Sequence, residues 1–131
     1  MKIIVVDDNT SFRKGLITYL VDILNHTVIG EAENAEEFLS LPNIKDANIV
    51  LMDNCMPQLK GIEVSKQYLL RNPKLKIIML TLQPELLTLK ELVESGLCGC
   101  VDKKDIHFQL PKALNRVQKG DVFFPENLTI L

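Results

Sequence analysis

The feature that most constrains the fold is a set of short apolar runs with no polar residue at every second position. The runs IIVV at 3–6 and IVLM within 48–52 are two examples. A strand with one solvent-exposed face alternates apolar and polar residues, whereas an unbroken apolar run is covered on both faces. Parallel sheets flanked by helices contain such strands. The sequence therefore predicts the α/β class, with a parallel sheet at its centre.

Strand-like and helix-like segments alternate five times along the chain. The predicted strands are 3–6, 27–32, 48–52, 76–81 and 99–102, and the predicted helices are 12–24, 34–40, 62–71, 84–95 and 106–119. Helix 84–95 has Pro84 in its first turn and Gly96 just beyond its end, which is the usual placement of both residue types. Right-handed crossovers between parallel strands then leave few topologies.

Size and charge place the chain among single-domain proteins. Its 131 residues fit one domain, assigned to 1–120, and we expect 121–131 to be a C-terminal tail or the start of a linker. The net charge of −2 gives no basic character for binding nucleic acid by this chain alone. No apolar run approaches the roughly 20 residues of a membrane span, and the N-terminal apolar stretch is too short for a signal peptide. We expect a cytoplasmic protein without a membrane partner.

The three cysteines predict neither a disulfide nor a zinc site. Cys98 and Cys100 lie two positions apart, on one face of a predicted strand, and such neighbours rarely reach disulfide geometry. No C-x-x-C pair occurs and only two histidines are available, which disfavours tetrahedral zinc. Reduced thiols are therefore expected.

Polar residues follow the predicted strands at their carboxyl ends, where ligands bind in folds of this class. They are Asp7 and Asp8 after the first strand, Asp53 after the third, Thr81 at the end of the fourth and Lys103 after the fifth. Each alone has an ordinary explanation, because acids and threonines cap helices and a single lysine is most often solvated. Three acids, one hydroxyl and one amine at successive strand ends are harder to explain in that way.

A cluster of three carboxylates needs a cation. At an effective dielectric constant near 20, two unit charges about 4 Å apart repel by roughly 4 kcal/mol. Oxygen ligands favour Mg²⁺ or Mn²⁺ over zinc. A hard cation and Lys103 would offset the charge of a phosphate group, while Asp53 acts as the nucleophile. The expected product is an aspartyl phosphate.

These residues resemble the receiver domain of two-component response regulators over about residues 2–120. The shared marks are Asp7-Asp8 after IIVV, the D-x-x-M-P motif of Asp53, Met56 and Pro57 with Gly61 beyond it, and Thr81 and Lys103. The resemblance implies a flavodoxin-like receiver fold, in which a five-stranded parallel sheet has the order 2-1-3-4-5 and helices on both faces.

The resemblance also implies residue roles. Asp53 would accept a phosphoryl group from a sensor histidine kinase, and Thr81 and Lys103 would hold the phosphoryl oxygens. The implied ligands of Mg²⁺ (or Mn²⁺) are Asp8, Asp53, the backbone carbonyl of Cys55 and, through water, Asp7. Such a domain is not an enzyme with turnover, because it acquires the phosphoryl group, loses it slowly and switches its output in between.

Two stretches give a finer resemblance. R-K-G-L at 13–16 and V-Q-K-G-D-V-F-F-P at 117–125 are similar to receivers that precede a LuxR-like helix-turn-helix domain. This similarity implies transcription regulation, with DNA bound only through a domain absent from this chain and with homodimers formed on phosphorylation. The alternative is a receiver that stands alone.

The sequence departs from the family pattern at four positions. Cys100 stands where a rotating Tyr or Phe is usual, Leu82 where a small residue is usual, Lys60 where an acid or Asn is usual, and Lys104 where Pro is usual. A one-residue shift would place Lys104 in the site, although the spacing from Gly99 favours Lys103. These departures concern how the signal leaves the site.

Two other functions fit parts of the sequence. A phosphatase with an aspartate nucleophile typically has a second acid two residues later, and that position is Cys55. Glycine-rich phosphate loops are absent from the sequence. The remaining alternative is a receiver-like interaction module that works without phosphorylation, because Cys100 and Leu82 are unusual.

Overall fold

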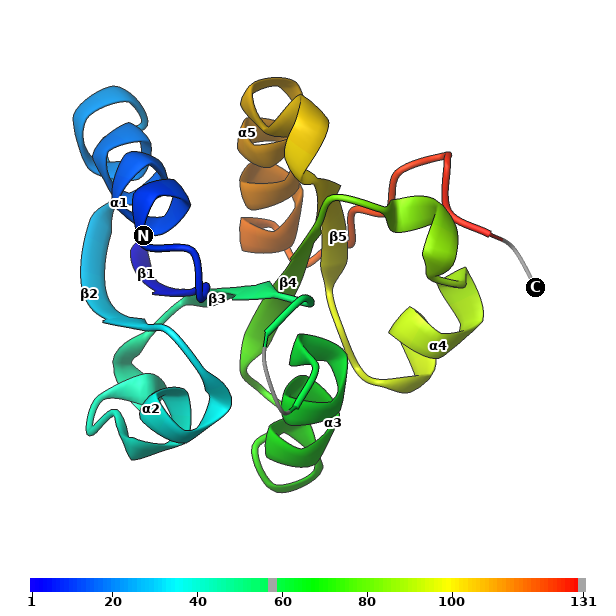
Figure 1. Cartoon of the computed structure of the whole chain (residues 1–131), viewed down its shortest axis with the longest axis horizontal. Coiled ribbons are helices and arrows are strands. Elements are labelled where there is room, and N and C mark those ends of the chain that lie inside the picture. The colour runs from blue at the N-terminus through cyan, green and yellow to red at the C-terminus, as the bar shows by residue number, and fades with distance from the viewer. Residues whose placement is uncertain (57–58, 130–131) are drawn as a thin grey trace.

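A computed structural model describes residues 1–56 and 59–129, and a five-stranded parallel sheet lies at its centre (Figure 1). The strands are β1 (Lys2–Val6), β2 (Thr27–Ala32), β3 (Ile49–Asp53), β4 (Lys76–Thr81) and β5 (Gly99–Asp102). All neighbouring pairs are parallel, in the order β2-β1-β3-β4-β5. The predicted class and strand order of a flavodoxin-like fold are therefore confirmed.

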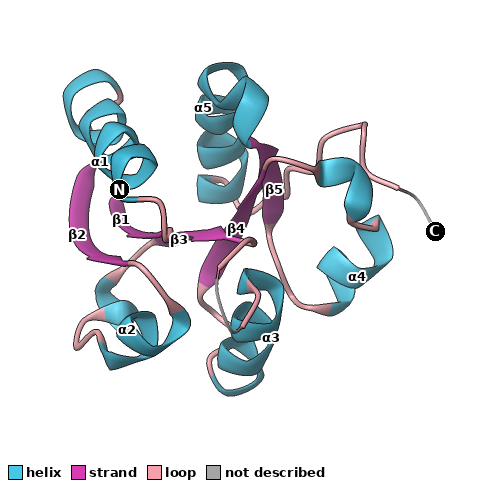
Figure 2. Cartoon of the chain, in the orientation of Figure 1, coloured by secondary structure: helices cyan, strands magenta, loops and turns pink. Residues whose placement is uncertain are grey.

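Five α-helices surround the sheet in the described part of the chain (Figure 2). They are α1 (Thr10–Thr18), α2 (Ala35–Ser40), α3 (Gly61–Arg71), α4 (Leu89–Glu94) and α5 (Ile106–Gln118). Helices α1 and α5 cover one face of the sheet, and α2, α3 and α4 cover the other. Within 1–56 and 59–129, no helix has both the length and the apolar character that crossing a bilayer requires.

Alternate side chains of each strand face the two helical layers. In β1, Ile4 and Val6 belong to the core beneath α2, α3 and α4, whereas Ile3 and Val5 belong to the core beneath α1 and α5. All four side chains are fully buried. This burial on both faces explains why the strand sequences contain unbroken apolar runs.

Asparagine side chains start two of the helices. Asn34 accepts a hydrogen bond from the Glu37 N–H at the start of α2, and Asn9 accepts one from the Phe12 N–H at the start of α1. Such caps satisfy N–H groups that have no partner within the helix. Helix α1 then continues as a short π-helical segment, Tyr19–Ile23, so the predicted helix 12–24 is correct in extent.

The predicted helix 84–95 is wrong in its first half. Pro84–Leu86 form a single 3-10 turn, and Leu87 and Thr88 are extended before α4 begins. The Thr88 hydroxyl accepts a hydrogen bond from the Glu91 N–H, and the Glu91 carboxylate accepts one from the Thr88 N–H. This capping box starts a new helix at that point, so Pro84 belongs to a separate turn.

Residues 121–129 pack on the domain. Phe123 forms a parallel bridge with Gly99 of β5, and Thr129 forms one with Thr88 ahead of α4. Figure 1 shows this segment in red, passing beside β5 and α4. The part of the chain assigned from sequence to a tail or linker is thus paired with the domain as far as Thr129.

Candidate functional site

Three carboxylates meet at the carboxyl edge of the sheet. Asp7 and Asp8 follow β1, and Asp53 is the last residue of β3, the neighbour of β1 in the sheet. One carboxylate oxygen from each residue lies within 4.8 Å of the others. The structure therefore brings together the three acids that the sequence places at successive strand ends.

Lys103 reaches this acidic cluster from the end of β5. Its Nζ lies 2.8 Å from Asp7 Oδ2 and 3.0 Å from Asp53 Oδ1. The same Nζ lies 4.3 Å from the centre of the Phe12 ring, which covers it from α1. One ammonium group thus pairs with two carboxylates of the cluster and is shielded by an aromatic ring.

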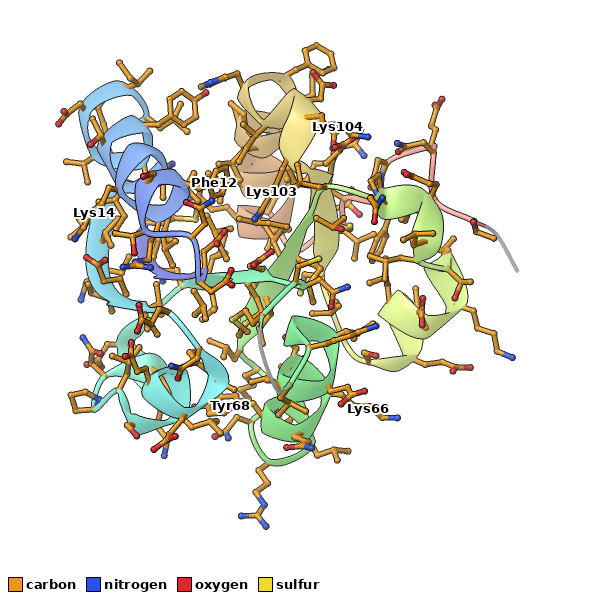
Figure 3. All side chains as sticks on the ribbon, in the orientation of Figure 1. Phe12, Lys14, Lys66, Tyr68, Lys103 and Lys104 are labelled. Atoms are coloured by element: carbon orange, nitrogen blue, oxygen red, sulfur yellow. The ribbon has the colours of Figure 1, made fainter. Side chains whose placement is uncertain are left out.

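Lys104 lies outside the cluster. In Figure 3 the Lys103 side chain extends toward Phe12, whereas Lys104 extends away from it. Lys104 is exposed, and its backbone N–H is held by the buried Asp102 carboxylate at 2.9 Å. The structure therefore favours Lys103 over Lys104 as the lysine of the site.

The two adjacent acids have different environments. Asp7 is fully buried, and its Oδ1 accepts a hydrogen bond from the Asn9 N–H at 2.8 Å while its Oδ2 accepts one from Lys103. The backbone carbonyl of Asp7 accepts a further hydrogen bond, at 2.7 Å, from Arg13. Asp8 is exposed. Asp7 is therefore fixed by the protein, and Asp8 faces solvent.

The ionisation of Asp53 and Lys103 is set by burial and by their mutual charges. Burial raises the pKa of Asp53, the positive charge of Lys103 opposes this, and the negative charge of Asp7 raises it again. Burial alone would lower the pKa of Lys103, but the hydrogen bond to Asp7 and the charges of Asp53 and Asp7 outweigh it and raise that pKa. Lys103 is therefore cationic at neutral pH, and an ionised Asp53 is costly without a further cation.

Thr81 lies at the end of β4 and is buried. Its Oγ1 accepts a hydrogen bond from the Gln83 N–H at 3.2 Å. A cleft of about 610 Å³ opens beside it, lined by Asp8, Cys55 and Met56 among others. This cleft joins the acidic cluster to solvent, so a phosphate group can reach the strand ends from this side.

The residues that follow Asp53 connect it to α3. The Asn54 side chain accepts a hydrogen bond from the Ile62 N–H at 3.2 Å, within the first turn of α3. The Cys55 N–H lies 3.3 Å from Asp53 Oδ1 and donates to it, and the Cys55 thiol is free and exposed. Met56 is buried, and Pro57 of the predicted motif lies outside the described residues.

Three residues of the site were not identified from sequence. Phe12 covers Lys103, Arg13 binds the Asp7 carbonyl and pairs with Glu31 at 2.8 Å, and Asn54 caps α3. Arg13 is one residue of the R-K-G-L stretch, but its partner on β2 is 18 positions away. No local pattern in the sequence indicates such contacts.

Gly61 packs directly against the strand that carries Asp53. A Cβ atom at this position would overlap the backbone carbonyl oxygen of Asp53. We expect Gly61→Ala to lower the free energy of unfolding by about 3 kcal/mol, because the obstacle is backbone and overpacking of this kind is costly. Urea unfolding of the variant and the wild-type protein measures the difference.

Gly15 provides the matched control for the same substitution. It lies inside α1, and a Cβ there would meet nothing within 4 Å. Gly15→Ala is expected to raise the free energy of unfolding by roughly 0.5–1 kcal/mol, because alanine loses less backbone entropy on folding. Equal effects of the two substitutions would contradict the close packing at Gly61.

A protein-family model described as "Response regulator receiver domain" matches residues 3–115. The response regulator GacA of Pseudomonas syringae pv. syringae is 32% identical over 120 residues, which are 92% of this chain and 56% of the relative. The transcriptional regulatory protein LnrK of Bacillus subtilis is 32% identical over 129 residues, which are 98% of this chain and 59% of the relative. The chain thus spans under two-thirds of the length of these regulators.

Solved structures show the same similarity. The isolated REC domain of RcsB from Salmonella enterica serovar Typhimurium, in the presence of the phosphomimetic BeF₃⁻, is 31% identical, with a TM-score of 0.82. The alignment covers 98% of this chain and 95% of that one. A complex of the two-component response regulator RcsB with DNA is also similar, with 31% identity, a TM-score of 0.83 and coverage of 98% of this chain and 65% of that one.

Proposed function

Because this chain belongs to the family of response regulator receiver domains, we propose that it is a phosphoacceptor whose phosphorylated residue is Asp53. The observation that carries the proposal is the buried Asp53 carboxylate, paired with Lys103 and placed within 4.8 Å of two further carboxylates. The donor would be a phosphohistidine of a sensor histidine kinase. Membership of the family places this chain among the receiver domains of two-component response regulators. The transfer of a phosphoryl group to Asp53 is our proposal.

The proposed transfer is a displacement at phosphorus. A carboxylate oxygen of Asp53 forms a bond to phosphorus, the bond from phosphorus to the histidine nitrogen breaks, and the electron pair leaves with that nitrogen. Lys103 is already beside Asp53 Oδ1 and would pair with a phosphoryl oxygen. The Thr81 hydroxyl, at the end of the next strand, would donate a hydrogen bond to another.

The donor set of the acidic cluster fits a hard divalent cation. All three groups are carboxylates, the type of ligand that Mg²⁺ and Mn²⁺ prefer. Both Asp7 oxygens already accept hydrogen bonds, which fits a contact of Asp7 with the cation through water. The resemblance to the family implies direct contacts from Asp8, Asp53 and the Cys55 carbonyl. When bound, the cation would offset the negative charge of the phosphoryl group.

Removal of Asp8 tests this assignment of the cation. At a Mg²⁺ concentration 100 times its Kd, the wild-type protein should gain about 2.7 kcal/mol of stability. Asp8→Ala should lose this gain, yet be at least as stable as the wild type without Mg²⁺, because a like charge has been removed. Thermal melts with and without Mg²⁺ measure both effects.

Asp7→Ala is the comparison for Asp8→Ala. Asp7 is buried and accepts a hydrogen bond from Lys103, so its loss should destabilise the protein even without Mg²⁺. A full Mg²⁺-dependent rise in Tm that persists in Asp8→Ala would contradict the proposed ligand set.

We further propose that the domain is not an enzyme with turnover, and that its phosphorylated form decays slowly. The alternative is an interaction module that needs no phosphorylation. Incubation of the protein with acetyl phosphate and Mg²⁺ distinguishes the two. One covalent phosphate detected by intact mass supports the phosphoacceptor, continuous release of inorganic phosphate indicates an enzyme, and no added phosphate supports the bare module.

DNA binding is proposed only for a longer regulator that contains this domain. The RcsB structure in complex with DNA belongs to a longer chain, of which this chain covers 65%. Homodimer formation on phosphorylation and a cytoplasmic location are likewise proposals for such a regulator.

Residues 1–131 should not retard a specific DNA fragment at physiological salt. Specific binding needs several Lys or Arg contacts to phosphates and further contacts to base edges, and the net charge here is −2. An electrophoretic mobility assay, with and without acetyl phosphate, provides the measurement. Retardation that depends on the DNA sequence would overturn the expectation.

A further inference from the structure

Residues 122–129, here called the C-terminal strap, are attached to the domain at two anchors. The first anchor is on β5, where the Cys100 N–H donates to the Phe123 carbonyl at 2.9 Å and the Phe123 N–H donates to the Cys98 carbonyl at 3.0 Å. A Cβ on Gly99 would lie 2.8 Å from the Phe123 carbonyl oxygen. The strap therefore lies so close to β5 that a residue with a Cβ atom at position 99 would contact the Phe123 carbonyl oxygen.

The second anchor is on the segment between β4 and α4. The Thr129 N–H donates to the Leu87 carbonyl at 3.0 Å, and the Leu89 N–H donates to the Thr129 carbonyl at 2.9 Å. The Thr129 hydroxyl donates to the Glu85 carbonyl at 2.7 Å. One residue of the strap thus makes three hydrogen bonds to the segment that begins at Thr81.

That segment also contacts the phosphorylation site at its other end. The Gln83 N–H donates to the Thr81 hydroxyl, and Glu85 and Leu87 are two and four residues further along. A Thr81 hydroxyl that turned to a phosphoryl oxygen would lose its present geometry with the Gln83 N–H, and the start of the following segment would lose that contact. The Glu85 and Leu87 carbonyls, which hold Thr129, belong to the same short segment.

Position 100, beneath the strap, is occupied by Cys100 and not by the Tyr or Phe that is usual in the family. No aromatic ring at this position can therefore rotate when the site is phosphorylated. Cys100 is fully buried, and burial, together with the charge of Asp102, raises the pKa of its thiol to about 12. It is therefore a small neutral group in the core that also contains Leu87 and Leu128. Leu82 is 54% exposed and does not fill this interior.

We propose that the C-terminal strap reports the state of the phosphorylation site: phosphorylation of Asp53 releases the Thr129 anchor and loosens residues 122–129. The proposal rests on the proposed function, because it needs the phosphoryl group to engage Thr81. Both anchors are short hydrogen-bonded contacts at the edge of the domain, which is the kind of structure that opens locally. In a longer regulator, the strap would pass this change to whatever follows it.

Hydrogen exchange on residues 1–131 tests the release directly. The protein is treated with acetyl phosphate and Mg²⁺, its phosphorylation is read by intact mass, and exchange is read in a peptide covering the strap. We expect exchange at the Thr129 amide to rise at least fivefold on phosphorylation, since coupling between two sites is typically about 5–150-fold. Asp53→Asn under the same conditions should show no rise.

Two substitutions of Thr129 test the coupling in the reverse direction. Thr129→Val keeps the β-branched shape but removes the hydroxyl that bonds Glu85, whereas Thr129→Ser keeps a hydroxyl. Because coupling between sites is reciprocal for binding free energies, Thr129→Val should bind the phosphate mimic BeF₃⁻ with Mg²⁺ severalfold more tightly than the wild type, and Thr129→Ser should behave as the wild type. Gly99→Ala, which obstructs the other anchor, should raise exchange in the strap before any phosphorylation.

The outcomes separate this inference from the proposed function. A protein that gains one phosphate while the exchange of the strap and the affinity of Thr129→Val for BeF₃⁻ stay unchanged overturns the inference and leaves the phosphoacceptor intact. A protein that gains no phosphate overturns the proposed function and the inference with it. Equal affinities of Thr129→Val and Thr129→Ser for BeF₃⁻ would show that the hydroxyl does not carry the coupling.

Discussion

Asp53→Asn is expected to abolish phosphorylation completely. The substitution keeps the size of the side chain but removes the carboxylate oxygen that would form the bond to phosphorus. Asp7 is also buried and paired with Lys103, but both of its oxygens already accept hydrogen bonds, from Lys103 and the Asn9 N–H. At Asp53, Lys103 and the Cys55 N–H both contact Oδ1. Incubation with acetyl phosphate and Mg²⁺, followed by intact mass measurement, should show one added phosphate on the wild type and none on the variant.

Asp53→Asn should remain folded, so its loss of phosphorylation would not result from unfolding. The pKa of Asp53 is raised in the folded state, chiefly by burial. An acid with a raised folded pKa loses stability as the pH rises from the unfolded pKa towards the folded one, so this carboxyl group costs stability at neutral pH. Without a divalent cation at pH 7, Asp53→Asn should therefore be at least as stable as the wild type. A phosphate gained by Asp53→Asn would show that the acceptor has been assigned to the wrong residue.

Lys103→Met is expected to have the largest effect on stability among these substitutions. The Lys103 ammonium is paired with Asp7 and Asp53, both almost fully buried. Removing one partner of such a buried group leaves uncompensated charge, which typically costs about 3–5 kcal/mol. Urea unfolding at pH 7 without divalent cations gives the loss, and the rate of phosphorylation should fall as well, because the positive charge beside Asp53 is gone.

The pH dependence of this loss has a definite sign. The pKa of Lys103 is raised in the folded state, so its contribution is fully present below the pKa of an unfolded lysine and is lost only as the pH rises through the folded value. In Lys103→Met, the pKa of Asp53 should rise further, because the opposing positive charge is absent. The deficit should therefore be largest at neutral pH and become smaller as the pH falls and the carboxyl groups are protonated.

Lys104→Met is the matched control for Lys103→Met. Its side chain is exposed and has no carboxylate within 4.0 Å in residues 1–56 and 59–129. Surface changes of this kind usually alter stability by no more than about 0.5 kcal/mol. Comparable losses in the two variants would mean that Lys103 does not hold the place assigned to it here.

Local patterns in the sequence were sufficient for most of the fold. Apolar runs marked the strands because both faces of the sheet are covered, as the four buried residues 3–6 of β1 show. The predicted helix 34–40 agrees closely with α2, whose start is set locally, because Asn34 bonds an N–H group only three residues away. The strand-end residues could be identified because parallel strands place their carboxyl ends at one edge.

The break ahead of α4 shows where local patterns were insufficient. Pro84 and Gly96 have the usual positions for the start and the end of one helix, and the sequence between them reads as helical. The structure instead pairs Leu87 and Leu89 with Thr129, which is about forty residues away, and this pairing holds the chain extended where a helix would continue. Backbone N–H and C=O groups that find hydrogen-bond partners elsewhere in the chain do not need partners within a helix.

Residue patterns alone predict a parallel α/β domain with acids, a hydroxyl and a lysine at its strand ends. The fixed Asp7 beside a solvent-exposed Asp8, the entry of Lys103 and not Lys104 into the cluster, and the attachment of residues 122–129 to the segment after Thr81 became visible only in the folded chain. The difference arises from distance along the chain. Burial patterns and caps act over a few neighbouring residues, whereas these contacts join side chains and backbone groups brought together only when the sheet is assembled.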